Sequence, residues 1–260
     1  MDLSIVIPVR NEAENIAPLV GEIRAALEGL AEYEIVYVDD GSSDPTAAEI
    51  LRLGAEAPGL RLLRHGQSLG QSAAIRTGVK AARGTWIATL DGDGQNDPAD
   101  IPELWRLCCA APATPPLLVI GYREARRDSW AKRSASRIAN RIRRRLLDDH
   151  TPDTGCGLKL LPRSLFLDLP YFDHMHRFLP ALVLREGGLV RSVRVNHRPR
   201  RRGISKYGVF DRLGVGIIDL FGVMWLQRRA ICPNLFAEPA RDLDVARPSN
   251  PPSATASTAR

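Results

Sequence analysis

The sequence predicts an α/β protein built on a mostly parallel sheet with helices on both faces. Short apolar runs alternate with stretches whose apolar residues recur at three- and four-residue steps, which is the order strand, helix, strand. A chain of 260 residues, 44% hydrophobic and 6% aromatic, has room for one sizeable globular domain of this class plus an appendage. Polar or acidic residues directly follow three of the apolar runs, and such sheets bind ligands at the carboxyl ends of their strands.

The elements follow one another regularly along the first half of the chain. The apolar run that begins at Leu3 is stopped by Pro8, and helical spacing follows from Asn15 to Leu30. Crossover connections of this kind place helices on both faces of a parallel sheet. The further predicted strands span residues 33–38, 60–64, 86–90 and 190–195, and the further predicted helices span 45–57, 71–82, 102–109 and 179–186.

Three polar segments are expected to lie together at one edge of this sheet. They are Pro8 to Glu12, the pair Asp39 and Asp40, and the stretch from Asp91 to Gln95. Because the carboxyl ends of parallel strands meet at the same edge, three such segments indicate a binding site better than three unrelated turns.

The stretch from Asp91 to Gln95 contains the residue types of a metal site. If strand geometry continues past the apolar run, Asp91 and Asp93 share a face. Their carboxylates and the amide oxygen of Gln95 suit Mg²⁺ or Mn²⁺, whose shell is usually completed by substrate phosphates. Gly92 and Gly94 are expected to leave room for a ligand close to the backbone. The alternative is an ordinary turn rich in Asp and Gly.

A set of motifs occurs along the chain in a fixed order. They are Ile7–Glu12, Val38–Ser42, the glycines 70, 78 and 84, Asp91–Gln95, Gly121–Arg123, Ser136–Arg137 with Asn140, Asp153–Gly157, and Arg200–Lys206. With this ordered set, residues 1 to about 225 resemble the family 2 glycosyltransferases, and among them the polyprenyl-phosphate glycosyltransferases typified by dolichol-phosphate mannosyltransferase. The resemblance implies the GT-A fold, a Rossmann-like α/β sheet flanked by helices.

The resemblance also implies roles for individual residues. The implied contacts with the nucleotide sugar are Pro8, Arg10, Glu12, Val38, Asp40, Asp91, Gly92, Asp93, Arg200 and Lys206. The implied metal ligands are Asp91, Asp93 and Gln95, and with Arg123, a cation near both phosphates, they are the candidate catalytic residues. The implied contacts with the acceptor phosphate are Arg123, Ser136 and either Lys132 or Arg133. The last choice stays open, because lysine is a point charge and arginine a bidentate fork.

The implied reaction moves a sugar from a UDP- or GDP-linked donor to a polyprenyl phosphate, with inversion and with Mg²⁺ or Mn²⁺ as cofactor. The acceptor oxygen is already anionic at neutral pH, so no strong general base is needed. One alternative is a family 2 transferase that extends a glycan on a hydroxyl acceptor, which would need a carboxylate base. The other is a non-catalytic protein that recruits a partner to a membrane.

Positive charge is concentrated in one part of the chain. The net charge is +6, and from Arg123 to Arg145 ten Lys and Arg residues stand against two acids. Apolar and basic residues there fall on different faces of a predicted helix from about 131 to 146, which suits an anionic membrane surface. A solvated charged face is the alternative. A nucleic-acid partner is disfavoured, because no nucleic-acid motif occurs and the predicted site is acidic.

The sequence of the C-terminal part is typical of a peripheral membrane protein. Its longest apolar stretch, Leu213 to Leu226, is interrupted by Asp219 and is shorter than the roughly 20 residues of a membrane span. It is expected to be an interfacial or re-entrant helix, the alternative being a buried helix packed on the domain. The absence of a secretory signal and of disulfide or metal spacing among the four cysteines predicts the cytoplasmic face. The predicted divisions are a catalytic domain over 1–198, a donor-closing loop and interfacial helix over 199–236, and a disordered tail over 237–260.

Overall fold

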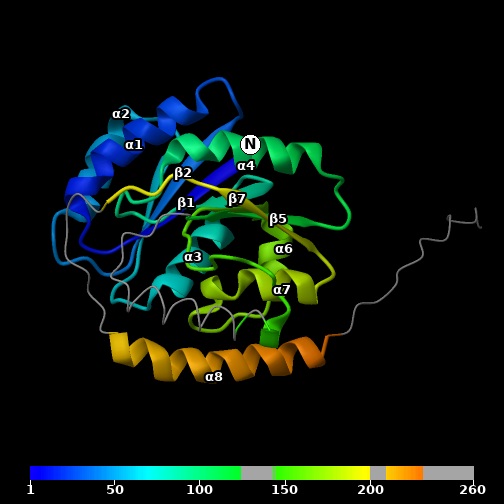
Figure 1. Ribbon diagram of the computed structural model, residues 1–260. Coiled ribbons are helices and arrows are strands. Elements are labelled where there is room, and N and C mark those ends of the chain that lie inside the picture. Colours follow the sequence, from blue (N-terminus) through cyan, green and yellow to red (C-terminus); the bar gives the residue numbers. More distant parts are fainter. Residues whose placement is uncertain (124–142, 144, 200–208, 231–260) are drawn as a thin grey trace, which may run out of the picture. The chain divides into compact units, whose positions relative to one another are not determined.

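The computed structural model describes residues 1–123, 143, 145–199 and 209–230, within a compact unit that runs from Met1 to Ala230. Its centre is one seven-stranded sheet in the order β3-β2-β1-β4-β6-β5-β7 (Figure 1). The strands are β1 (Leu3–Val9), β2 (Tyr33–Asp39), β3 (Leu60–Arg64), β4 (Trp86–Thr89), β5 (Leu117–Tyr122), β6 (Lys159–Pro162) and β7 (Leu189–Arg194). Only β6 runs antiparallel to its neighbours, β4 and β5, so the prediction of a mostly parallel α/β sheet is confirmed.

Helices cover both faces of the sheet, as predicted. They are α1 (Ala13–Leu27), α2 (Thr46–Glu56), α3 (Gln71–Ala81), α4 (Ile101–Ala110), α6 (Arg163–Asp168), α7 (Leu179–Arg185) and α8 (Val209–Arg228). Two 3₁₀ turns, η1 (Pro98–Asp100) and η2 (Met175–Arg177), precede α4 and α7. Figure 1 shows α1, α2 and α4 on one side of the sheet and α3, α6 and α7 on the other.

The interior strand β1 shows why helices pack on both faces of the sheet. Leu3, Ile5 and Ile7 pack into the core beneath α1, α2 and α4, whereas Val6 packs into the core beneath α3, α6 and α7. All four side chains are fully buried. Because alternate residues of a strand point to opposite faces, a strand buried on both faces is a continuous apolar run, which is the pattern that the sequence showed.

Two predicted boundaries were wrong. Pro8 does not stop the first strand, because β1 continues to Val9 in register with β2. Pairing of β1 with β4 ends at Val6, so the N–H that Pro8 lacks is not needed on that side. The first helix ends at Leu27 rather than Leu30, because Gly29 takes a positive φ of 68° and turns the chain.

The C-terminal helix α8 is longer than predicted and lies on α7. Asp219, which interrupts its apolar sequence, lies 3.2 Å from the ring of His174. Val223 is buried, whereas apolar side chains of α8 are exposed, so the helix packs on the domain along one side only. Two further polar contacts fix it, from Arg185 Nε to the Leu226 carbonyl (3.0 Å) and from Gln227 Nε2 to the Leu147 carbonyl (2.8 Å). In the described part of the chain, no helix has the length and apolar character needed to cross a bilayer.

Three predictions concern segments outside the described residues. The basic helix predicted near 131–146 falls there, except for helical positions 143 and 145–147. The predicted tail over 237–260 falls there entirely. The predicted divisions between 198 and 199 and between 236 and 237 lie beside or within such segments and stay predictions.

Candidate functional site

The polar segments after β1, β2 and β4 lie at one edge of the sheet, as predicted. Val9 pairs with Asp39, and Val6 pairs with Thr89, in parallel register, so the three strands end side by side. The first two segments are also joined to each other. The Asn11 N–H donates to Ser42 Oγ and the Glu12 N–H to Thr46 Oγ1, each at 2.9 Å.

Asp40 holds the loop that leads from β3 to α3. Its buried carboxylate accepts four hydrogen bonds, from His65 Nδ1 (2.7 Å), Ser68 Oγ (2.7 Å), Leu69 N (2.8 Å) and Gly70 N (2.9 Å). Burial alone would raise the pKa of Asp40, but these hydrogen bonds together lower it below its usual value. A carboxylate has about four acceptor positions, so the loop uses all of them. The side chain of Asp40 therefore shapes this loop, and the direct contact that the resemblance implies for it stays a prediction.

Asp40→Ala is expected to reduce the free energy of unfolding by roughly 2–4 kcal/mol, because it leaves two main-chain N–H groups without their acceptor. Since the pKa of Asp40 is lowered on folding, its contribution is present above the ordinary carboxyl pKa and is lost as pH falls through the folded value. Urea unfolding at pH 7 and at pH 3 measures both effects. Glu56→Ala, at an exposed carboxylate on α2, is the control and should change stability little. Equal stability of Asp40→Ala and wild type at pH 7 would contradict the assignment.

Asp91 lies just beyond β4, where charges of both signs meet. Gln71 Nε2, at the start of α3, donates to Asp91 Oδ1 at 2.9 Å. Burial, and after it the negative charge of Asp93, raise the pKa of Asp91 above its usual range. The positive charges of Lys159 and Arg123 act in the opposite direction. A divalent cation beside the two carboxylates would relieve their repulsion, so this pair is suited to bind one.

The segment from Asp91 to Gln95 is a turn, so the premise that Asp91 and Asp93 alternate along a strand was wrong. β4 ends at Thr89, and the turn is closed by the Gln95 N–H, which donates to Asp93 Oδ1 at 3.1 Å. The prediction that Gly92 leaves room for a ligand was also wrong. A Cβ at Gly92 would lie 2.4 Å from Val9 Cγ1, so the space is filled by the end of β1. Gly94 has open space around it, and its φ of 71° is the reason for glycine there.

Gly157 lies directly against the carboxylate of Asp91. A Cβ at this position would lie 2.3 Å from both Cγ and Oδ2 of Asp91, so only glycine allows this contact. The Gly157 carbonyl accepts a hydrogen bond of 2.7 Å from Thr89 Oγ1. The antiparallel strand β6 thereby brings the segment before it to the same edge as the carboxyl ends of β1, β2 and β4.

Arg123 and Lys159 supply fixed positive charge at this edge. Arg123 forms a two-point ion pair with Asp153, at 2.6 Å from Nε and 3.0 Å from Nη2, and both side chains are largely buried. Lys159, on β6, is buried and donates to the carbonyl of Cys156. Burial lowers the pKa of Lys159, while the neighbouring Cys156, Asp91 and Asp153 favour its charged form. The predicted cation Arg123 and the additional cation Lys159 are therefore close enough to Asp91 for their charges to favour its ionised form.

Family comparison identifies the chain. A family model for glycosyl transferase family 2 matches residues 4–169. The chain is 36% identical over 244 residues to a dodecaprenyl-phosphate galacturonate synthase of Rhizobium johnstonii, which covers 91% of this chain and 70% of that protein. It is also 36% identical over 217 residues to an undecaprenyl-phosphate 4-deoxy-4-formamido-L-arabinose transferase of Edwardsiella ictaluri, over 82% of this chain and 65% of that protein.

The chain is a family 2 glycosyltransferase. The prediction of the family and of an enzyme is thereby confirmed. The glycosyltransferase also resembles solved structures of glucosyl-3-phosphoglycerate synthase from Mycobacterium tuberculosis. A complex of that enzyme with UDP aligns with a TM-score of 0.63 at 18% identity, covering 90% of this chain and 81% of that one. Another, with Mn²⁺, UDP and phosphoglyceric acid, aligns with a TM-score of 0.64 at 19% identity, covering 90% of this chain and 80% of that one. The GT-A fold is therefore confirmed.

The other predicted site residues of the glycosyltransferase differ in where they lie. Pro8, Arg10 and Glu12 lie at the carboxyl end of β1, on the predicted edge. The side chain of Val38 is fully buried in the core against α3, and the predicted contact of Val38 with the nucleotide stays a prediction. The predicted residues that fall outside the described part of the chain are Lys132, Arg133, Ser136, Arg200 and Lys206.

The candidate metal ligands of the glycosyltransferase suit a divalent cation that is coordinated partly by the protein and partly by a substrate. In the described residues, no group of three or more Asp, Glu, His or Cys side chains could hold an ion. The predicted ligands are fewer, namely the two carboxylates of Asp91 and Asp93 with the side-chain amide of Gln95. Mg²⁺ and Mn²⁺ commonly bind one or two carboxylates and complete their shell with water and phosphate oxygens.

Two site residues were not predicted as such from the sequence. Lys159 carried a signal, since it is an ionisable residue between Leu158 and Leu160 in an apolar run, and such residues are seldom buried without a role. Gln71 carried no signal, because a polar residue at a helix start is ordinary. Only the loop from β3 to α3, held by Asp40, brings Gln71 to Asp91.

Proposed function

We propose that this glycosyltransferase moves a sugar from a nucleotide-sugar donor to a polyprenyl phosphate at the cytoplasmic face of a membrane, with inversion. The observation that carries the proposal is the pairing of two carboxylates, Asp91 and Asp93, with the fixed cations Arg123 and Lys159 at one sheet edge. Both substrates carry phosphate, and such an edge offers a place for a metal and cations for the remaining charge. The polyprenyl-phosphate acceptors in the names of both relatives support the acceptor class.

The roles that we propose follow from this arrangement. Asp91, Asp93 and the Gln95 amide hold Mg²⁺ or Mn²⁺, which when bound neutralises charge on the leaving nucleoside diphosphate. Pro8, Arg10 and Glu12 border the nucleotide. Arg123, held rigidly by Asp153, faces the phosphates of donor and acceptor. Of the residues outside the described ranges, we propose that Arg200 and Lys206 close over the donor and that Ser136, with Lys132 or Arg133, binds the acceptor phosphate.

A strong general base is not required by the proposed reaction, because the acceptor oxygen is already anionic at neutral pH. Asp153 pairs with Arg123, and both of its oxygens accept hydrogen bonds from that guanidinium. We therefore assign Asp153 to the holding of Arg123 and not to proton transfer.

The test of the function is transfer of radiolabelled sugar from a panel of UDP- and GDP-sugars, uronic acids included, to undecaprenyl or dodecaprenyl phosphate. Label that enters the chloroform-soluble lipid with Mn²⁺ or Mg²⁺, and not with EDTA, supports the proposal and names the donor. The corresponding free prenol is the control acceptor and should receive none. Label on the prenol or on a glycan, and none on the lipid phosphate, would favour the hydroxyl-acceptor transferase.

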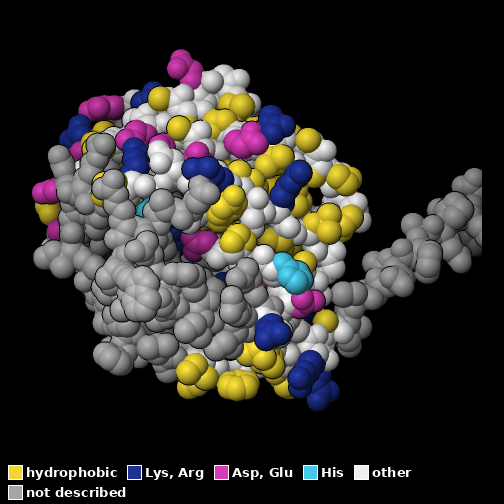
Figure 2. All heavy atoms as spheres, viewed as in Figure 1, with side chains coloured by type: hydrophobic (Ala, Val, Ile, Leu, Met, Phe, Trp, Pro, Cys, Tyr) yellow, Lys and Arg dark blue, Asp and Glu magenta, His cyan; other side chains and the backbone are white. Residues whose placement is uncertain are grey.

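We propose that α8 is the membrane-contacting element. Its outer side exposes Ile217 (53%), Ile218 (73%), Phe221 (62%) and Trp225 (59%), next to the exposed Arg228 and Arg229. Figure 2 shows apolar side chains along the lower edge of that view, where α8 runs in Figure 1, with basic side chains at one end. Aromatic and basic residues together suit the headgroup region of an anionic leaflet. The free thiols of Cys108, Cys109 and Cys156 suit a reducing, cytoplasmic setting.

Phe221→Ser combined with Trp225→Ser is expected to weaken binding to vesicles that contain anionic lipid by about tenfold or more, because two large apolar side chains no longer enter the interface. Sedimentation with vesicles measures this effect. Turnover with a short-chain, water-soluble acceptor phosphate should stay unchanged. Leu51→Ser, at an exposed leucine of α2, is the matched control and should leave vesicle binding intact. Equal binding by the α8 variant and wild type would refute the role of this helix.

A further inference from the structure

The residues that follow β7 lie along the loop that holds the candidate metal ligands. Asn96 and His197 form an antiparallel bridge, and the Arg198 N–H donates to the Gln95 carbonyl at 3.0 Å. Asn196 donates one hydrogen bond to the end of the same loop, to Asp97 Oδ2 (3.0 Å), and one to Asp100 Oδ2 (2.8 Å) in the η1 turn that follows it. We call residues 91–97 the metal loop. Its second half is therefore fixed from one side by residues 196–198.

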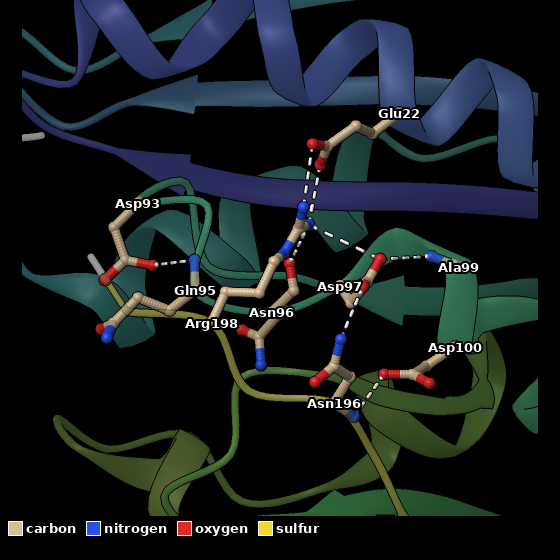
Figure 3. A network of polar contacts seen from close by, with 9 residues as sticks. All are labelled: Glu22, Asp93, Gln95, Asn96, Asp97, Ala99, Asp100, Asn196 and Arg198. Atoms are coloured by element: carbon tan, nitrogen blue, oxygen red, sulfur yellow. Dashed lines mark hydrogen bonds and ion pairs between the residues drawn. The ribbon is translucent and has the colours of Figure 1, made fainter. Parts of the chain in front are cut away.

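Arg198 extends this contact to a third element, α1. Its guanidinium forms a fork with Glu22, at 2.9 Å from Nη1 to Oε1 and 2.7 Å from Nη2 to Oε2. Nη2 also donates to the main-chain carbonyl of Asn96 at 3.1 Å and lies 3.6 Å from Asp97 Oδ1. Figure 3 shows the guanidinium between Glu22 on α1 and the metal loop, with Asp93 and Gln95 in the same loop. One side chain therefore joins a rigid helix to the backbone next to Gln95.

We propose that Arg198 is a positioning residue of the metal loop: by joining Glu22 of α1 to the main chain at Asn96, it holds Asp93 and Gln95 at the place where they can share a cation with Asp91. The proposal rests on the function proposed above, since it takes these three residues as the metal and diphosphate site. It assigns a role to two residues, Arg198 and Glu22, that lie outside that site.

Arg198 contacts the metal loop at its main chain. Nη2 donates to the Asn96 carbonyl while the same guanidinium is held by Glu22. A contact with the main chain fixes the backbone that carries Gln95, which is what a positioning role requires.

The guanidinium geometry makes the assignment specific. Two parallel N–H groups meet the two oxygens of Glu22, and a further N–H of Nη2 reaches the Asn96 carbonyl. A lysine ammonium is a single point of charge and cannot make this fork while also reaching the loop. Arg198→Lys should therefore retain the charge and part of the function, whereas Arg198→Gln should lose both.

The test is a titration of Mn²⁺ into the full-length protein, followed by electron paramagnetic resonance, with UDP binding measured by calorimetry at each metal concentration. Arg198→Gln and Glu22→Gln are each expected to raise the Mn²⁺ concentration for half-saturation by about tenfold or more, as for other residues that orient metal ligands. The double variant should bind Mn²⁺ no more weakly than either single variant, because both substitutions break the same contact. The Mn²⁺ affinity of Arg198→Lys should lie between those of wild type and Arg198→Gln. Transfer assays should show higher donor KM values, with kcat recovered at saturating Mn²⁺.

The exposed ion pair of Arg106 with Glu103 on α4 provides the matched control, since Arg106→Gln removes a similar fork and should leave Mn²⁺ affinity unchanged. If Arg198→Gln and Glu22→Gln lower the melting temperature but bind Mn²⁺ as tightly as wild type, the contact is structural and the positioning role is refuted. If wild type itself binds no Mn²⁺ with or without UDP, the metal site of the proposed function fails, and this inference fails with it. The Glu22→Gln result decides the matter should Arg198→Gln not fold.

Discussion

Replacing Asp93 by asparagine is expected to lower the transfer rate at saturating donor by about 10²–10³-fold or more, because it removes one of the two carboxylates that we propose as ligands of the metal. The fold should persist, since Asp93 lies in a partly exposed turn and an asparagine oxygen can still accept the Gln95 N–H. Rates measured across a Mn²⁺ titration, together with thermal unfolding, separate loss of metal from loss of fold.

The control for this variant is Glu103→Gln, which removes an exposed carboxylate from α4, a short distance along the chain. It should retain the wild-type rate and the wild-type metal dependence. Full turnover of Asp93→Asn at low Mn²⁺ would overturn the assignment of the Asp91 and Asp93 pair as the metal site.

Gly157→Ala is expected to reduce the affinity for the donor by about 100-fold, because it would displace the carboxylate of Asp91, which we propose as a metal ligand. A small displacement of such a group can reduce affinity by this much. The added Cβ would lie 2.3 Å from Cγ of Asp91, whose carboxylate is also held by Gln71. Something must move, and overpacking of this kind costs about 1–3 kcal/mol of stability. Calorimetry with UDP and Mn²⁺ measures the first effect and urea unfolding the second.

A double-mutant cycle assigns the cause. In an Asp91→Ala background the same change at Gly157 should cost much less stability, because the carboxylate with which the Cβ collides is gone. Gly21→Ala is the matched control, since nothing lies within 4 Å of its added Cβ, and an alanine inside α1 should stabilise slightly. If Gly157→Ala destabilises both backgrounds equally, contact with Asp91 is not the reason for glycine.

The fold could be predicted well because several of its strands are buried on both faces. Largely apolar runs such as Leu3–Val9 and Tyr33–Val38 leave little choice of structure, and the second of these extends by only one residue in β2. The predicted element ends were wrong where a single residue, or the pairing around it, decides where the element ends. Pro8 was expected to end β1, but β4 no longer pairs with β1 at this position, so the strand continues in register with β2 alone. The end of α1 was fixed by Gly29 and not by the apolar spacing that reached Leu30.

The site could be predicted only in part, for a different physical reason. Parallel strands end at one edge, so the meeting of the segments after β1, β2 and β4 followed from the order of elements. The partners of Asp91 could not be predicted from the order of elements. Gln71 reaches Asp91 through a loop, and Gly157 reaches it through an antiparallel strand that comes later in the chain. Nor does a carboxylate in a motif reveal whether it faces a ligand. The oxygens of Asp40 are taken up by its own loop.

The antiparallel insertion of β6 also bears on how the protein acquires activity. Thr89 and Gly157, which are hydrogen-bonded at the site, lie 68 positions apart in the chain. Contacts between residues so far apart form only after a large loop has closed, which is slow and entropically costly. The β1–β2 and β2–β3 pairs can form from the N-terminal part alone, but Asp91 acquires its Gly157 and Lys159 neighbours only when β6 has entered the sheet. A nascent or truncated chain that ends before residue 157 therefore lacks part of the proposed site, and we expect donor binding to report completion of the fold.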